Sequence, residues 1–239
     1  MKYKLIAMDF DGTLLTDDKK VSPWTKKELA SLKEKGYIIV GATARTLDSV
    51  KNILDIDIFD YIILNNGVSI YDVGCDKDEW MGSINLDIVS DIITYVDQDC
   101  LQADLISGTK YYVYKYQKRS SLPFIVDIDR IEDVPCKLAR MNIFFKDGVD
   151  VLEYYEKINK QSSDVNCFVM QSSDDDKKWL VVNPLNINKK ETLSHLGNEL
   201  GISLDEMIFF GDGLNDLEVL EGVGLGVGMG NALDEVLDK

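Results

Sequence analysis

The sequence predicts an α/β fold, a doubly wound parallel sheet into which a second, α+β domain is inserted. Short apolar runs alternate with helical segments at the beginning of the chain, and the same alternation returns at its end. The middle of the chain has a different, strand-rich pattern. Alternating strands and helices are typical of parallel sheets with helices on both faces. We therefore expect residues 1–83 and 184–239 to form a core and residues 84–183 to form the inserted domain.

The N-terminal elements follow from apolar runs and helix-boundary signals. Residues 4–8 (KLIAM) are almost entirely apolar, as in a strand that is buried on both faces. Ser22 and Pro23 form an N-cap and first-turn pair, which predicts a helix over residues 24–35. The next expected elements are a strand at 37–40, a helix at 47–54 and a strand at 61–64.

The C-terminal part repeats this order, whereas the middle does not. At the C-terminus we expect helices at 189–200, 215–220 and 232–237, the last capped by Asn231, and strands at 207–210 and 223–229. In the middle we expect helices at 86–96 and 151–158, and strands at 111–116, 139–145, 167–170 and 179–182. Strands that mostly follow one another without helices between them indicate α+β character, hence a separate domain.

The composition is that of an acidic globular protein. Its 239 residues carry 26 Lys and Arg against 42 Asp and Glu, a formal net charge of −16. This balance disfavours a nucleic-acid backbone or an anionic membrane as partner. No apolar run has the length of a membrane span, and the N-terminus does not resemble a signal peptide. We expect a cytoplasmic protein; the sequence leaves its oligomeric state open.

Cysteine and histidine are scarce. The four cysteines, at positions 75, 100, 136 and 167, are scattered and are expected to be free thiols. His195 is the single histidine, which excludes a His-rich zinc or iron site. It lies in a helical stretch without catalytic neighbours, so we expect a surface or packing role.

Polar residues follow three of the expected core strands, at 9–13, 41–45 and 211–216. The carboxyl ends of parallel strands are where doubly wound sheets bind ligands, so these segments should converge. The D-x-D pattern alone carries no information here, because it occurs six times among 30 aspartates. Asp9 and Asp11 differ from the others because they follow a buried strand and precede the Gly12-Thr13 turn. Asp127-Ile-Asp129 lacks that context and is expected to be solvated surface.

The expected site is rich in acids. Asp9, Asp11, Asp212 and Asp216 cannot all be ionised in one cleft without compensation. A divalent cation held by oxygen ligands resolves this, and the absence of His and Cys favours Mg²⁺. With a cation present, a carboxylate can attack phosphorus and form an aspartyl-phosphate. Lys189 is a candidate second positive charge, and Thr43 a candidate phosphate ligand.

These segments resemble the motifs of the haloacid dehalogenase superfamily, and within it the Cof-type sugar phosphatases, which have a Rossmann-like core and a large α/β cap. The resemblance spans the chain. The matching segments are DFDGTL at 9–14, ATAR at 42–45, Lys189 within NPLNINKKETL, GDGLNDLEVL at 211–220 and GVGMGNA at 226–232. Three positions depart from the family pattern, namely Ala44, Lys190 and Val181, and none of them is a proposed catalytic residue.

The resemblance implies a role for each matching residue. It implies that Asp9 is the nucleophile and that Asp11 is the acid and then the base. It implies that Thr43 and Lys189 bind the phosphoryl group. The implied Mg²⁺ ligands are Asp9, the backbone carbonyl of Asp11, and Asp212. Supporting roles around the metal and phosphate fall to Gly12, Thr13, Arg45, Asn215 and Asp216.

In the inserted domain, residues 111–119 (YYVYKYQKR) interleave aromatic and basic side chains. They fit either a base-stacking platform or, more simply, a hairpin with one packed face. The tyrosines, Lys115, Lys118, Arg119 and Arg140 are candidates for holding the leaving group. Asp174–Asp176 with the following lysines is expected to be a solvated turn.

The leading functional hypothesis is a Mg²⁺-dependent phosphomonoester hydrolase that acts on a small phosphorylated metabolite, with sugar phosphates implied by the resemblance. A phosphomutase or phosphotransferase on the same scaffold is an alternative, because Asp11 would serve both reactions. A non-hydrolytic phospho-aspartate signalling protein is a second alternative. The inserted domain of about 100 residues, which a bare phosphoacceptor does not need, counts against it.

Overall fold

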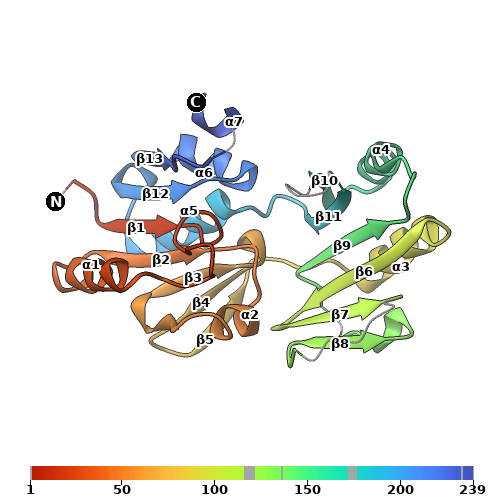
Figure 1. Ribbon diagram of the computed structural model, residues 1–239, viewed down its shortest axis with the longest axis horizontal. Helices are drawn as coiled ribbons and strands as arrows, with labels where there is room; N and C mark the ends of the chain where they lie inside the picture. Colours follow the sequence, from red (N-terminus) through yellow and green to blue (C-terminus); the bar gives the residue numbers. More distant parts are fainter. Residues whose placement is uncertain (1, 116–121, 136, 172–176, 233, 239) are drawn as a thin grey trace. The chain divides into compact units, whose positions relative to one another are not determined.

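The computed structural model describes residues 2–115, 122–135, 137–171, 177–232 and 234–238. The chain forms two compact units (Figure 1). The first comprises Met1–Met81 and Ile187–Lys239, and the second comprises Gly82–Asn186. The sequence analysis expected the divisions after residues 83 and 183.

The first unit is built on a seven-stranded sheet of order β13-β12-β1-β2-β3-β4-β5. Its strands are β1 (Leu5–Met8), β2 (Ile38–Ala42), β3 (Tyr61–Leu64), β4 (Ser69–Asp72), β5 (Lys77–Trp80), β12 (Met207–Gly211) and β13 (Leu225–Gly228). From β13 to β3 all neighbours are parallel, which confirms the predicted fold class. The antiparallel strands β4 and β5 are an addition to the prediction. The sequence analysis did not predict β5, because its residues (KDEW) are charged and half exposed and contain no apolar run.

Helices accompany this sheet. They are α1 (Pro23–Glu34), α2 (Leu47–Lys51), α5 (Lys189–Leu200), α6 (Leu217–Gly222) and α7 (Asp234–Leu237). The Ser22 side chain accepts the backbone N–H of Thr25, as an N-cap should. Gly201, in the left-handed conformation, ends α5. Two predictions were too long: α2 stops at Lys51, and α7 begins at Asp234.

The predicted helix at 215–220 was wrong at its start. A 3₁₀ turn over Leu214–Asp216 precedes α6. The Asp216 side chain explains the tighter turn, since Oδ2 accepts the backbone N–H groups of Asp212 and Gly213 at 3.2 and 3.1 Å. Here an acidic side chain near the start of a helix stabilises the preceding turn by accepting its backbone N–H groups.

Strand β1, in the interior of the first unit's sheet, is buried on both faces. Ile6 and Met8 of β1 belong to one apolar cluster, which includes residues of α1 and α2. Leu5 and Ala7 belong to a second cluster, which includes residues of α5 and α6. Because successive strand residues point to opposite faces, a continuous apolar run such as this one marks a strand covered twice.

The second unit holds a six-stranded sheet of order β10-β11-β9-β6-β7-β8. Its strands are β6 (Cys100–Ser107), β7 (Lys110–Tyr114), β8 (Ile125–Ile128), β9 (Arg140–Phe145), β10 (Val165–Gln171) and β11 (Lys178–Pro184). Its helices are α3 (Leu86–Val96) and α4 (Val151–Gln161). The sequence analysis missed β6 and β8, whose apolar residues are interrupted by Gln and Asp. Strand β7 pairs antiparallel with β6 and parallel with β8.

Several sequence predictions can be followed in this unit. Asp127 and Asp129 are exposed, as expected. Cys100 and Cys167 are buried free thiols, and Cys75 of the first unit is an exposed one. Cys136, Lys118, Arg119 and the expected turn at 174–176 lie outside the described residues.

Among the helices that the structure describes, none combines the length and apolar character that crossing a membrane requires.

Candidate active site

Three loops of the first unit lie at the carboxyl ends of adjacent parallel strands. In register, Met8 at the end of β1 stands beside Phe210 of β12 on one side and Gly41 of β2 on the other. The loop after β1 begins with Asp9, whose N–H donates to the Phe210 carbonyl at 2.9 Å. The segments 9–13, 43–45 and 212–216 thus meet at one edge of the sheet, as the topology predicts.

Lys189 links two of these loops. It lies at the start of α5, and its side chain is 1% exposed. Nζ is 2.6 Å from Asp9 Oδ1 and 2.6 Å from Asp216 Oδ1. Asp9 and Asp216 are themselves buried. One buried ammonium therefore holds two carboxylates that are 207 positions apart in the sequence (216 − 9).

Burial and charge act in opposite directions on these groups. Burial raises the pKa of Asp9, the Lys189 ammonium lowers it, and Asp216 raises it again; the net shift is upward. Burial lowers the pKa of Lys189, but the carboxylates of Asp9 and Asp216 outweigh this and raise it. The lysine is therefore charged, and the acids carry more negative charge than it can neutralise.

Asp212 adds a third carboxylate. Its Oδ1 accepts the Thr13 hydroxyl at 2.9 Å. Burial raises the pKa of Asp212, and the neighbouring Asp216 also raises it. Gly12 packs directly on this side chain, since a Cβ at Gly12 would overlap Asp212 Oδ2. The φ of Gly12 is +87°, a conformation that suits glycine.

Asp11 lies apart from this group of acids and is held by cations. Arg45 donates through Nε to Oδ2 at 2.7 Å and through Nη2 to Oδ1 at 2.7 Å. Lys19 Nζ donates to Oδ1 at 2.8 Å. Burial raises the pKa of Asp11, but the bonds from Arg45 and Lys19 outweigh it and lower the pKa to about 2. Lys19 was missed from the sequence, because it lies eight residues along a polar loop with no motif.

The remaining predicted residues also lie at this edge. Thr43 is 1% exposed, and its Oγ1 accepts the Arg45 N–H at 3.2 Å. Asn215 donates to Asn66 Oδ1 at 3.0 Å. The backbone N–H of Asn65 donates to the Arg45 carbonyl, and that of Asn66 to the Thr43 carbonyl. The Asn65-Asn66 turn therefore supports the loop that carries Thr43.

Sequence analysis did not single out Asn65 or Asn66, although a signal existed. They follow β3 at the same end of the sheet as the other site loops. Asn65 is 1% exposed, and its Oδ1 has no hydrogen-bond partner within the described part of the chain. A buried amide oxygen without a partner marks a place where a ligand or water can bind.

The acidic cluster has the chemistry of a divalent-metal site. One carboxylate oxygen each from Asp9, Asp212 and Asp216 lies within 4.8 Å of the others. Hard oxygen donors with excess negative charge, and the raised pKa values of Asp9 and Asp212, fit a bound cation. The carboxylate of Asp11 is outside this group; the resemblance implied its backbone carbonyl as ligand.

The candidates for holding a leaving group lie in the second unit. Lys115 forms an ion pair with Asp97, 2.6 Å between Nζ and Oδ1. Arg140 is buried, and its Nε has no hydrogen-bond partner among the residues that the structure describes. The Lys115 ammonium contacts the carbonyl and the carboxylate of Asp97, so Arg140 Nε is the donor of this pair that is buried without a partner in the described residues.

The fold is that of a Rossmann-like α/β protein, and its candidate site is an acidic centre that contains a lysine. A family model of the haloacid dehalogenase-like hydrolases matches residues 6–239. The chain belongs to this family, which confirms the resemblance that the motifs predicted and the enzyme class of hydrolase.

Relatives extend over nearly the whole chain. A phosphatase of Bacillus subtilis (strain 168), named for 5-amino-6-(5-phospho-D-ribitylamino)uracil, is 27% identical; the match covers 98% of this chain and 86% of the relative. An HMP-PP phosphatase of Serratia proteamaculans (strain 568) is 28% identical with the same coverage. The crystal structure of a haloacid dehalogenase-like hydrolase from Bacteroides thetaiotaomicron superimposes with a TM-score of 0.81 at 25% identity, covering 99% of this chain and 92% of that one.

Proposed function

We propose that this enzyme is a Mg²⁺-dependent phosphomonoester hydrolase that works through an aspartyl-phosphate at Asp9. The observation that carries the proposal is the position of Asp9. It is a buried carboxylate at a strand end, paired with Lys189 at 2.6 Å and adjacent to two further acids. A buried carboxylate that is held beside an ammonium group and further acids suits nucleophilic attack on phosphorus, because a bound cation and the ammonium together can offset the repulsion between the carboxylate and a phosphate dianion.

The metal ligands proposed are Asp9, Asp212 and the backbone carbonyl of Asp11, with Asp216 supporting the site. Bound there, Mg²⁺ would supply charge neutralisation between the nucleophile and the phosphate dianion. The chain's own cation, Lys189, keeps Asp9 ionised and attracts the phosphate oxygens. Thr43 and the backbone N–H groups of the Gly12-Thr13 turn would hold the remaining phosphate oxygens.

The reaction then has two halves. An Asp9 carboxylate oxygen attacks phosphorus, the bond from phosphorus to the ester oxygen breaks, and that oxygen takes a proton from Asp11. Asp11, now ionised, takes a proton from water, and the water oxygen attacks phosphorus. The bond from phosphorus to Asp9 breaks, which releases inorganic phosphate. The structure holds Asp11 in its ionised form, bound to Arg45 and Lys19. Before the first half, Asp11 must therefore release at least one of these contacts and take up a proton from solvent, which it then donates to the leaving oxygen.

The proposed substrate is a small phosphorylated metabolite with a polyol or sugar part. The family resemblance of the motifs supports sugar phosphates. The B. subtilis relative, by its name, acts on a phosphorylated ribityl chain joined to uracil. The proposed cytoplasmic location fits such a substrate and the free thiols of Cys75, Cys100 and Cys167.

Phosphate release tests the proposal. Wild type, Asp9→Asn and the exposed control Asp57→Asn would be assayed with p-nitrophenyl phosphate, sugar phosphates and nucleotides, with Mg²⁺ or with EDTA. We expect turnover by wild type and by Asp57→Asn that EDTA abolishes, and no turnover by Asp9→Asn. Absence of release by all three proteins would instead favour phosphoryl transfer to another acceptor. A phospho-aspartate that persists for hours would favour signalling.

A further inference from the structure

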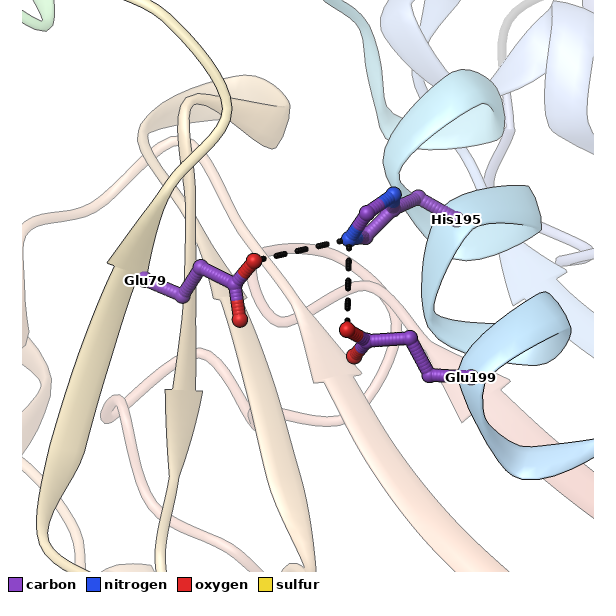
Figure 2. A group of neighbouring side chains, drawn as sticks. All are labelled: Glu79, His195 and Glu199. Carbon is purple, nitrogen blue, oxygen red and sulfur yellow. Dashed lines mark ion pairs between the residues drawn. The ribbon is translucent and has the colours of Figure 1, made fainter.

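A second group of potential metal ligands lies in the first unit, away from the acidic cluster. It consists of Glu79 on β5 with His195 and Glu199 on α5 (Figure 2). His195 Nε2 is 3.6 Å from Glu79 Oε1 and 3.7 Å from Glu199 Oε1. All three side chains are more than 40% exposed, so an ion can reach them directly from solvent.

The distances from His195 Nε2 to the two carboxylate oxygens suit three ligands of one ion better than three hydrogen-bonded side chains. At 3.6 and 3.7 Å, both contacts of Nε2 exceed the range of N–H···O hydrogen bonds. A tetrahedral ion with bonds of about 2.0–2.2 Å sets its ligand atoms about 3.3–3.6 Å apart. Small side-chain rotations would therefore bring the three atoms to that geometry. Figure 2 shows the two carboxylates approaching the same ring nitrogen from different elements.

The backbone already holds these residues in place. His195 and Glu199 are four residues apart on α5, so they share one face of the helix. The adjacent residues Leu193 and Leu196 are buried in the core, which fixes the helix. Glu79 stands opposite Ile70 in the antiparallel pair of β4 and β5. Binding would order three side chains without moving the backbone, which keeps its entropic cost low.

Charge at this edge favours a cation. Within the described part of the chain, neither Glu79 nor Glu199 has a lysine or arginine within ion-pair distance. Acids are also present near Tyr61 of β3, where burial raises the pKa of the tyrosine and Asp72, Asp60 and Glu199 raise it further. Two nearby carboxylates that have no lysine or arginine partner lose repulsion when a cation binds between them.

We propose that Glu79, His195 and Glu199 form a binding site for a late first-row divalent cation of the zinc class, with water as fourth ligand. An imidazole nitrogen with carboxylate oxygens is a zinc ligand set, whereas Mg²⁺ prefers oxygen alone. The site is therefore chemically distinct from the acidic cluster of Asp9, Asp212 and Asp216. It does not depend on the proposed phosphatase reaction.

The bound ion would connect β5 to α5. Strand β5 is the last strand at its edge of the sheet, and Met81, which follows it, is the last residue of the first unit before the second begins. An edge strand is held by one neighbour only, so it opens more easily than the strands within the sheet. A metal link from β5 to a helix that is anchored in the core stabilises the folded unit by mass action.

Calorimetric titration with ZnCl₂ in excess Mg²⁺ tests the proposal. The proteins compared are wild type, His195→Gln, Glu79→Gln and the control Glu28→Gln, an exposed glutamate on α1. Asp212→Asn would report any zinc held by the acidic cluster, and Cys75→Ser any zinc held by the exposed thiol between β4 and β5. We expect one saturable site in wild type, and the same site in Glu28→Gln, Asp212→Asn and Cys75→Ser. We expect the affinity to fall at least about tenfold in His195→Gln and Glu79→Gln.

Thermal unfolding gives a second readout that is independent of activity. Zinc should raise the Tm of wild type and of Glu28→Gln, and it should leave that of His195→Gln unchanged. Equal zinc affinity in wild type and His195→Gln would overturn the proposal, as would the absence of saturable binding in wild type. Loss of the site in Cys75→Ser, with retention in His195→Gln, would place the zinc on the thiol and equally contradict it.

Discussion

The Arg45 guanidinium donates a hydrogen bond to each oxygen of the Asp11 carboxylate, with Nε 2.7 Å from Oδ2 and Nη2 2.7 Å from Oδ1. This two-point contact fixes the orientation of the carboxylate as well as its charge. Asp11 is the residue proposed to move protons in both halves of the reaction. The pair therefore sets the starting position of the acid–base group.

Replacing Arg45 should impair catalysis through Asp11. We expect Arg45→Met to lower kcat/KM about 10²-fold, because Asp11 loses its orientation. Arg45→Lys should recover part of the activity, since it restores the charge without the two-point contact. Lys19→Met removes the more exposed of the two cations and should change kcat/KM less than Arg45→Met. Steady-state kinetics of the three variants would check this order, and an effect of Lys19→Met larger than that of Arg45→Met would contradict it.

The same pair predicts a pH dependence of stability. The pKa of Asp11 is about 2 in the folded protein, against an ordinary aspartate value of 3.8. A lowered pKa means that the ionised group stabilises the folded state above the higher value, and that this contribution is lost as the pH falls from about 4 to about 2. Because Asp11 is 39% exposed, water screens the pair and its contribution is at most about 1 kcal/mol.

Urea unfolding of wild type and Arg45→Met at several pH values measures this contribution. The difference in unfolding free energy between the two proteins should be largest near neutral pH and should shrink at about pH 3. A difference that grows on acidification would show that the Arg45–Asp11 pair has the opposite linkage.

Lys189 should be required for folding stability as well as for activity. Lys189→Met leaves Asp9 and Asp216 buried without their ammonium partner, which should cost about 3–5 kcal/mol of unfolding free energy. Lys27→Met, an exposed lysine on α1, is the matched control and should change stability by less than about 0.5 kcal/mol. Chemical denaturation measures both. Equal stability of the two variants would mean that Lys189 is not the counter-charge of the buried acids.

Substitutions at Gly12 and Gly36 would distinguish the cost of an unfavourable backbone conformation from the effect of a clash with the candidate site. Both have a φ of +87°, but a Cβ at Gly36 would meet nothing within 4 Å, whereas one at Gly12 would overlap Asp212 Oδ2. Gly36→Ala should therefore cost only the backbone penalty, about 1–2 kcal/mol, and keep full kcat. Gly12→Ala should displace Asp212 and lower kcat and apparent Mg²⁺ affinity together. Similar kinetics for the two variants would refute the proposed role of this contact.

The sequence predicted the parallel part of the fold well because its signals are local. Residues 5–8 are apolar without interruption, and Ser22-Pro23 and Gly201 mark helix ends. Strands β5 and β6 were missed because each depends on a partner strand rather than on its own pattern. Lys77–Trp80 is charged, and Cys100–Ser107 carries polar residues at interior positions.

The residues of the candidate site were likewise predicted where their sequence signals are local and missed where they are not. Asp9, Lys189 and Asp212 follow strands or begin a helix within recognisable motifs, so sequence alone singled them out. Lys19 and Asn65 did not stand out, because their importance arises from three-dimensional contacts with Asp11 and with the Thr43–Arg45 loop. The contact between Glu79 and His195 joins residues 116 positions apart (195 − 79), which no local pattern reveals.

The most direct test of the proposed mechanism is to trap the covalent intermediate. Wild type would be mixed with p-nitrophenyl phosphate and Mg²⁺, quenched with acid during turnover, digested and analysed by mass spectrometry. The account predicts a peptide that carries one phosphoryl group on Asp9, and no such peptide from Asp9→Asn or after EDTA treatment. Turnover by wild type with unmodified Asp9 and a phosphoryl group on another residue would contradict the proposal that Asp9 is the nucleophile.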